Sequence, residues 1–504
     1  MPARATARVA PTEVALRAWI LCAFLVASPL AAQPLDLTPY PDLAARLELY
    51  RLWVEDQRAH LGQPGVAIAI VHDQQLVWAR GFGVADVGSG RPVTPEAVFR
   101  LGSVSKTFTA TAAMALVEAG KLRLDDPVVK HVPGFSRFPG LGGAASPEIT
   151  LWHLLTHTSG LPREAAFPYW TDRRFPTVPE MLAGLARQQP LFEPGTDYQY
   201  SNLGLALAGE VVAAAAGKPY PQVVAERILK PLGMESTFVE QPPAGTSLAT
   251  GYLIRRSDGS FPVAPDTASE GLTPAANLSS NVLDLARYLS SHLATGTGAK
   301  AILKPATLRE MQRVQWINSG WTSGRGIGFG LSRQGGRMLV GHGGWVAGHR
   351  SQVSFDPKAK IGVVVLTNSD EGGPGSYVRQ AFEVVAPALE KALAPKRAEP
   401  QSLTAPERYV GRYHNPWGET TEVLVVDGRL SMYDHGHPPT DDPVGSLTRL
   451  VPLGDHRFQI EGSARVLVFE MRADGKVARV LLDENYIFPQ GCGEIGPDLQ
   501  CAWK

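Results

Sequence analysis

The sequence has little cysteine, no excess of charge of either sign and only a short apolar run near its beginning. Only three of its 504 residues are cysteine, so a framework of disulfide bonds cannot hold the main fold. Basic and acidic residues both number 48, giving a formal net charge of zero. No basic run is long enough to follow a phosphate backbone, so no nucleic-acid partner is expected.

Two common catalytic motifs are also missing. No Gly-x-Ser-x-Gly stretch occurs, which excludes the nucleophile elbow of α/β-hydrolases. His153 and His157 stand four residues apart, but the His-Glu-x-x-His pattern of zinc hydrolases is missing and no third ligand stands out. Neither a metal nor another cofactor is therefore expected.

The N-terminal segment has the features of a secretory signal peptide. Arg4, Arg8 and Arg17 accompany an apolar run over 18–27, and small residues follow up to Ala32. The run is shorter than the ~20 apolar residues that a membrane-spanning helix needs, so an uncleaved anchor is the less favoured alternative. We expect an exported protein, periplasmic or secreted, with no membrane span after cleavage.

After a signal peptide of 1–32, the pattern predicts a large α/β domain over 33–393. A helix is expected from Pro41 to Gln57, with one apolar face. Further strands are predicted at 65–71, 76–83, 326–332, 337–341, 351–355 and 361–367, and the region between 103 and about 320 is mostly helical. This order predicts an antiparallel sheet flanked by helices, with an all-helical subdomain inserted between its two parts.

An Ala/Pro/Lys-rich linker, 394–406, separates this domain from a small all-β domain, 407–504. Short strands with turn residues between them indicate a small barrel or sandwich there. If the signal peptide is removed, Cys492 and Cys501 are the only cysteines left, and in an oxidising compartment we expect them to form a disulfide. Two free thiols are the alternative.

Three short polar motifs occur in order along the large domain. They are Ser103-x-x-Lys106, Tyr200-x-Asn202 and His342-Gly343-Gly344. Each is weak alone, because roughly one Ser-x-x-Lys is expected by chance, and residues 413–415 form a second Tyr-x-Asn in an expected strand. Together they supply a nucleophile, bases and an oxyanion site, which are the parts of acyl transfer.

With the segments that flank these motifs, such as residues 150–162 and 231–234, the chain from about 65 to 367 resembles the serine β-lactamase-like superfamily. It is nearest the group of class C β-lactamases, D-aminopeptidases, DD-carboxypeptidases and esterases. The C-terminal strands resemble a lipocalin-like domain found in some members. The resemblance implies the β-lactamase/transpeptidase-like fold.

The resemblance also implies roles for individual residues. Ser103 would attack a carbonyl, Lys106 and Tyr200 would relay its proton to the leaving group, and Asn202 would orient Lys106 and the substrate amide. The backbone N–H groups of Ser103 and Trp345, beside Gly343 and Gly344, would form the oxyanion hole. Lys106 can serve as a base only if burial lowers its pKa from ~10.4 toward neutrality.

The third motif departs from the Lys-Thr-Gly that many members have. His342 lacks the permanent charge that would hold a substrate carboxylate, which favours peptidase or esterase activity over efficient β-lactamase activity. Arg350, with His349 beside it, is a candidate for the missing cation. The prediction is that Arg350→Ala raises KM for carboxylate-bearing substrates.

The expected function is that of an exported serine hydrolase cleaving amide bonds of small peptides, including linearised cyclic peptides or peptides with D-residues. Hydrolysis of carboxylic esters is one alternative activity, and weak β-lactamase activity is another. A penicillin-type binding protein that has lost turnover is the rival class. Ser103→Ala separates the two classes, because only an enzyme has turnover to lose. The sequence does not assign an oligomeric state.

Overall fold

The structure is a computed structural model, and it describes residues 1, 34–143, 148–294, 301–394, 405–415, 417–434, 446–495 and 501–503. The chain forms two compact units, Met1–Ala392 and Leu393–Lys504. The predicted signal peptide and most of the predicted linker lie outside the described residues. No helix in the described ranges is both long and apolar enough to cross a membrane.

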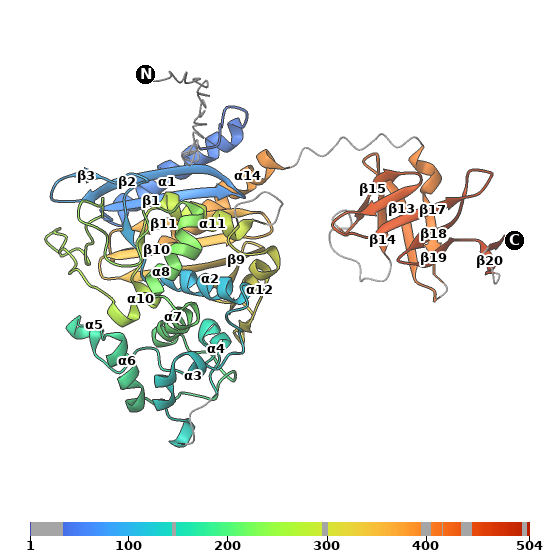
Figure 1. The fold of residues 1–504 in the computed structure, drawn as a ribbon. Coiled ribbons are helices and arrows are strands. Elements are labelled where there is room, and N and C mark those ends of the chain that lie inside the picture. Colours follow the sequence, from blue (N-terminus) through green and yellow to red (C-terminus); the bar gives the residue numbers. More distant parts are fainter. Residues whose placement is uncertain are drawn as a thin grey trace. The chain divides into compact units, whose positions relative to one another are not determined.

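A nine-stranded sheet forms the centre of the first unit (Figure 1). Its order is β3-β2-β1-β11-β10-β9-β8-β7-β6. The strands are β1 (Gly65–His72), β2 (Gln75–Asp86), β3 (Arg91–Pro92), β6 (Trp316–Ile317), β7 (Ser323–Arg325), β8 (Gly330–Gln334), β9 (Arg337–Val346), β10 (His349–Asp356) and β11 (Ile361–Thr367). Because β1 pairs antiparallel with β11, both ends of the domain contribute to one sheet, as predicted.

Apolar strands at the centre of this sheet are covered on both faces. Ile68 of β1 pairs with Val365 of β11, and both are buried. Helix α1 (Pro41–His60) buries the apolar face that the sequence predicted, Leu43, Leu47, Tyr50 and Val54. Helix α11 (Val282–Leu293) packs on β1 and β11. Burial on both faces explains why these strands read as continuous apolar runs.

Most of the other helices of the unit lie between β4 and β6 in the chain and form the helical subdomain and its surroundings. They are α2 (Ser105–Glu118), α3 (Val128–His131), α4 (Leu151–Thr156), α5 (Tyr169–Asp172), α6 (Val178–Gly184), α7 (Asn202–Ala216), α8 (Tyr220–Val224), α9 (Lys230–Leu232), α10 (Thr273–Ala276) and α12 (Pro305–Gln312). Strand β4 (Phe99–Arg100) pairs with β5 (Ser279–Ser280), and α13 (Pro374–Gln380) and α14 (Ala386–Leu393) end the unit.

Helices α2 and α7 are the elements that carry the first two motifs. The small side chains of α2 let neighbouring backbone come close: a Cβ at Gly328 would lie 2.2 Å from Cβ of Ala110. Helix α7 begins where the Ser201 hydroxyl accepts a hydrogen bond from Gly204 N, and it ends at Gly217 with a positive φ of 65°. Both ends of α7 therefore follow from the sequence.

The second unit contains a closed eight-stranded barrel. Its strands are β12 (Gly411–His414), β13 (Thr420–Val426), β14 (Arg429–Asp434), β15 (Thr448–Gly454), β16 (Arg457–Ile460), β17 (Val466–Met471), β18 (Val477–Leu482) and β19 (Asn485–Pro489). Side chains fill its interior, with the rings of Tyr409, Phe458 and Phe469 in mutual contact. The barrel alternative of the prediction is confirmed.

A two-stranded hairpin, β20 (Cys492–Ile495) and β21 (Cys501–Trp503), follows the barrel. Cys492 is disulfide-bonded. The side chain of Cys501 lies outside the described residues, so its pairing with Cys492 stays a prediction.

Candidate active site

Ser103 and Lys106 face each other at the start of α2. Ser103 lies in a 3₁₀ turn, Gly102–Val104, that leads directly into the helix, and Lys106 follows one turn later. The Lys106 Nζ is 3.0 Å from the Ser103 Oγ and donates a hydrogen bond to the Ala275 carbonyl at 2.8 Å. The Ser-x-x-Lys spacing therefore puts amine and hydroxyl in contact.

Burial makes Lys106 a suitable base. Its side chain is fully buried, and this desolvation lowers its pKa to about 7. The negative charge of Glu164 raises the pKa, and the positive charge of Arg163 lowers it. Near neutral pH, a substantial fraction of Lys106 is the free amine that can accept the Ser103 proton.

Tyr200 completes the group around Ser103. Burial raises its pKa to about 12, while a hydrogen bond with Ser103 acts in the opposite direction. The Lys106 Nζ lies 4.9 Å from the centroid of the Tyr200 ring. Tyr200 therefore carries its proton at neutral pH, and of the two candidate bases Lys106 is the one that is free to accept.

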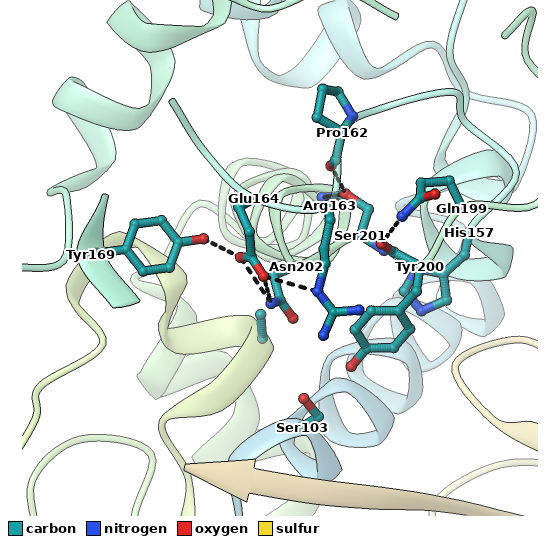
Figure 2. Close-up of polar contacts among 12 residues, drawn as sticks. Ser103, His157, Pro162, Arg163, Glu164, Tyr169, Gln199, Tyr200, Ser201 and Asn202 are labelled. Atoms are coloured by element: carbon teal, nitrogen blue, oxygen red, sulfur yellow. Dashed lines mark hydrogen bonds and ion pairs between the residues drawn. The ribbon is translucent and has the colours of Figure 1, made fainter. Parts of the chain in front are cut away.

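A turn at the end of α4 holds Tyr200 in place (Figure 2). His157 adopts the left-handed conformation with φ 62°, and its Nδ1 accepts a hydrogen bond from Ser201 N at 3.0 Å. Its carbonyl accepts another from Gln199 N at 2.9 Å, and its ring packs on Tyr200 at 4.6 Å between centroids. Desolvation lowers the pKa of His157 well below its ordinary value, so the imidazole stays neutral.

Asn202 is bound to a carboxylate that the sequence analysis missed. Its Nδ2 donates to both oxygens of Glu164, at 2.8 and 2.9 Å (Figure 2). Glu164 also pairs with Arg163 and accepts a hydrogen bond from the Tyr169 hydroxyl. The Asn202 Oδ1 is buried and has no hydrogen-bond partner in the described part of the chain. Asn202 is not part of the cleft lining described below, and the Lys106 Nζ donates to the Ala275 carbonyl, so the predicted role of Asn202 in orienting Lys106 and the substrate amide stays a prediction.

His342 of the third motif lies beside Tyr200, with 6.1 Å between ring centroids. Desolvation and the charge of Lys106 lower its pKa to about 3. Its Nδ1 is 2.6 Å from the Gly343 carbonyl, which can only accept, so Nδ1 carries the proton and Nε2 does not. The third motif contributes a neutral acceptor and no positive charge.

The backbone of β9 is pressed against the turn that carries Ser103. A Cβ at Gly344 would lie 1.9 Å from the Leu101 carbonyl oxygen, and a Cβ at Gly102 would lie 2.7 Å from Trp345 N. Only glycine fits at either position. The close contact between Gly102 and β9 brings the backbone of Trp345 near Ser103. The family resemblance predicts the oxyanion hole at this place.

A cleft of about 740 Å³ opens over these residues. Its lining includes Ser103, Tyr200, His342, Gly343, Gly344 and Trp345, together with Arg163, Tyr198, Arg325, Gln352 and residues of β8. Arg350 is not part of this lining, and its Nε donates to the Asp370 carbonyl at 2.9 Å. His349 is buried. The guanidinium groups of the cleft belong to Arg163 and Arg325, and the role predicted for Arg350 stays a prediction.

Arg325 is directed toward the third motif. A Cβ at its cross-strand partner Gly330 would lie 2.7 Å from the Arg325 Nη1, and Gly330 in turn pairs with Gly341. The Arg325 Nε donates to the Tyr198 hydroxyl at 2.8 Å. Within the described ranges, no carboxylate forms an ion pair with Arg325.

The family model described as "Beta-lactamase" matches residues 51–385, a region that includes all three motifs. The chain belongs to the Beta-lactamase family. Its relatives include serine hydrolases of several activities. It is 29% identical to "Beta-lactamase-like protein 2" of Dictyostelium discoideum over 72% of this chain and 70% of that protein.

Two further relatives match a shorter part of the chain. Esterase EstB of Burkholderia gladioli is 35% identical over 42% of this chain and 57% of its own length. The D-alanyl-D-alanine-carboxypeptidase/endopeptidase AmpH of Escherichia coli K12 is 32% identical over 44% of this chain and 56% of its own length.

Among solved structures, the octameric penicillin-binding protein homologue from Pyrococcus abyssi has a TM-score of 0.59 at 28% identity. That match covers 88% of this chain and 99% of the other. EstCE1, a hydrolase with promiscuous acyltransferase activity, has a TM-score of 0.59 at 26% identity and covers 70% of this chain and 100% of its own. Proteins with several different activities are thus similar to this chain in sequence and fold.

Proposed function

We propose that this member of the Beta-lactamase family is an exported serine hydrolase that cleaves amide bonds of small peptides through an acyl-enzyme on Ser103. The contact between Lys106 Nζ and Ser103 Oγ, together with a Lys106 pKa of about 7, carries the proposal. A serine beside a buried free amine is the activated nucleophile that acyl transfer needs. Export rests on the signal-like segment at the N-terminus.

The reaction would proceed in two steps. Ser103 Oγ attacks the substrate carbonyl carbon while Lys106 accepts the hydroxyl proton, and backbone N–H groups near Trp345 stabilise the oxyanion. The C–N bond then breaks, and the leaving nitrogen takes a proton from Tyr200, which is replenished from Lys106. In the second step water attacks the acyl-enzyme, gives its proton to the same groups and releases the acid and free Ser103.

A free carboxylate on the peptide is part of this proposal. Arg325 lines the cleft and lies over Gly330, directed toward the strand that bears His342. Within the described part of the chain the Arg325 guanidinium forms no ion pair, and such a guanidinium is well suited to bind a substrate carboxylate. This supports short peptides with a free carboxylate as substrates, and the proposal includes linearised cyclic peptides and peptides with D-residues among them.

Ester hydrolysis is the second candidate. The neutral third motif and the 35% identity to an esterase over 42% of the chain favour it. Weak β-lactamase activity and a binding protein without turnover are the remaining alternatives. Small differences in pocket residues are enough to change substrate preference within one mechanism.

A matched substrate panel tests the proposal. Purified full-length protein and its Ser103→Ala variant are assayed with short D- and L-peptides that have a free carboxylate, with the same peptides as C-terminal amides, and with p-nitrophenyl esters. We expect peptide cleavage that depends on Ser103 and is fastest for the free acids. Turnover of the esters alone would replace the peptidase assignment with the esterase one. No turnover of any substrate would favour the binding protein.

A further inference from the structure

Two tryptophan rings stand in contact at the rim of the catalytic cleft. Trp345 of β9 is 44% exposed and Trp170 of α5 is 40% exposed, and their ring centroids are 5.5 Å apart. Trp345 also lines the cleft that contains Ser103. Large apolar side chains that remain open to solvent beside a catalytic serine form a surface that a ligand can cover.

Both rings are held in fixed orientations. The Trp345 indole Nε1 donates to the Asp370 Oδ1 at 2.7 Å, and the same oxygen accepts a hydrogen bond from Gly348 N at 3.1 Å. The Trp170 ring contacts the buried Phe175 edge-on, with 5.3 Å between centroids. The two indoles, here called the tryptophan wall, therefore need little ordering when a ligand binds.

The position of the wall indicates which part of the substrate it contacts. The leaving group must lie near Tyr200, which gives it a proton, and Tyr200 is beside His342. Trp345 follows His342 by three residues on the same strand, which places it ~10 Å farther along β9. The Trp345 backbone also lies against Gly102, the residue before Ser103. The wall thus lies away from the leaving-group end of the site, on the side where the acyl part of a substrate would extend.

We infer that the tryptophan wall binds an aromatic or bulky aliphatic side chain on the acyl part of the substrate. This inference rests on the proposed function, because it assumes a carbonyl held over Ser103. An indole surface favours such a group by apolar burial and ring contact. A substrate with only a methyl group at this position would leave both rings exposed.

The experiment compares Trp170→Ala, Trp170→Phe and Trp321→Ala in the full-length protein. Trp321 is 73% exposed and, within the described ranges, makes no ring contact with Trp345, so its replacement controls for the loss of an exposed indole outside the wall. The substrates are p-nitrophenyl phenylacetate and p-nitrophenyl acetate, which share a leaving group. Trp170→Ala should reduce the phenylacetate-to-acetate ratio of kcat/KM about tenfold. Trp170→Phe should keep most of this preference for phenylacetate over acetate, and Trp321→Ala should leave the ratio of kcat/KM values unchanged.

An equilibrium measurement separates the failure of this inference from the failure of the proposed function. Phenylacetate binding is measured by calorimetry on the Ser103→Ala protein, with and without Trp170→Ala. A loss of affinity with Trp170→Ala supports the wall even if no ester is turned over. If the affinity and the selectivity ratio are both unchanged, or if Trp321→Ala changes them equally, the inference is wrong. Absence of an acyl-enzyme on Ser103 would instead defeat the proposed function.

Discussion

Full burial of Lys106 is the residue-level feature on which the proposed chemistry depends. An exposed lysine at neutral pH is almost entirely protonated and cannot accept the Ser103 proton. In this site desolvation lowers the pKa of Lys106 to about 7, and the nearby Glu164 keeps it from falling further. The same enclosure raises the pKa of Tyr200 to about 12. The two groups thereby take different roles at one pH.

The pH dependence of kcat/KM tests this division of roles. Because activity requires the free amine of Lys106, kcat/KM should rise with pH through an apparent pKa near 7 and then level off. Glu164→Gln removes a negative charge that favours the ammonium, so the inflection should move to lower pH. Lys106→Arg should reduce kcat/KM by roughly 10³-fold or more, since arginine stays protonated. A wild-type inflection near pH 10 would contradict the account.

Arg325 gives a second prediction at the residue scale. Arg325→Ala should raise KM about tenfold for a peptide with a free carboxylate and change it less than twofold for the matching amide, because one charge-assisted contact is lost. The control is Arg333→Ala on β8, an exposed arginine that does not line the cleft. Equal changes for acid and amide, or the same effect in Arg333→Ala, would show that Arg325 does not bind the carboxylate.

At the scale of elements, the turn that ends α4 determines where Tyr200 lies. His157 contacts the backbone on both sides of Tyr200 and packs on its ring. His153, four residues earlier, has a different task, since its Nδ1 accepts a hydrogen bond from Thr150 N at the start of the same helix. The side chains of both histidines, which the sequence offered as possible zinc ligands, thus form hydrogen bonds with nearby backbone.

His157→Asn should separate positioning from folding. Asparagine tolerates the left-handed backbone but lacks the ring that packs on Tyr200. We expect kcat to fall about tenfold or more with little change in KM, because displacement of a catalytic group slows the chemical step. His153→Asn should instead lower the melting temperature and leave kcat unchanged, since it removes a helix cap. Similar effects of both variants on kcat would refute the positioning role.

The sequence predicted β1, β2, β10, β11 and α1 closely, because continuous apolar strands and amphipathic helices have strong local signals, but the strand predicted at 326–332 spans the turn between β7 and β8. It was less accurate around β9. It predicted a strand over 337–341, whereas β9 continues to Val346 and includes the motif His342-Gly343-Gly344. Gly344 is needed there because a Cβ would lie 1.9 Å from the Leu101 carbonyl oxygen and 2.3 Å from the Ser351 Oγ, and such contacts between distant segments leave no local pattern.

At the scale of the whole molecule, the first unit and the barrel each have a core of their own. Every residue that lines the cleft belongs to the first unit, Met1–Ala392. The barrel interior is filled by its own aromatic and aliphatic side chains. The residues proposed for catalysis, Ser103, Lys106, Tyr200 and His342, likewise belong to the first unit.

Truncation after residue 394 tests this independence. The shortened protein should fold, and its kcat/KM should stay within about threefold of the full-length value across the substrate panel, because the cleft lining and the sheet are intact. Circular dichroism confirms folding before the kinetics are compared. A folded truncated protein with much lower kcat/KM would assign the barrel a part in substrate binding or turnover.

The candidate site was only partly predictable from the sequence. Ser103, Lys106, Tyr200 and His342 stand in short motifs, and the structure brings them together. Glu164 and Arg325 stand in no motif that the sequence analysis used, and they reach the site through the turn after α4 and through the pairing of β7 with β8. Their roles depend on which elements meet in space, so they became apparent only from the fold.

The most direct test of the account is whether Ser103 is the activated nucleophile. Full-length protein is treated with a fluorophosphonate and examined by intact mass and peptide mapping. The account predicts one adduct, located on Ser103 and strongly reduced in Lys106→Arg, whereas Arg333→Ala is labelled like the wild type. A folded protein that forms no adduct, or one labelled at a different serine, would contradict the assignment of Ser103 and Lys106.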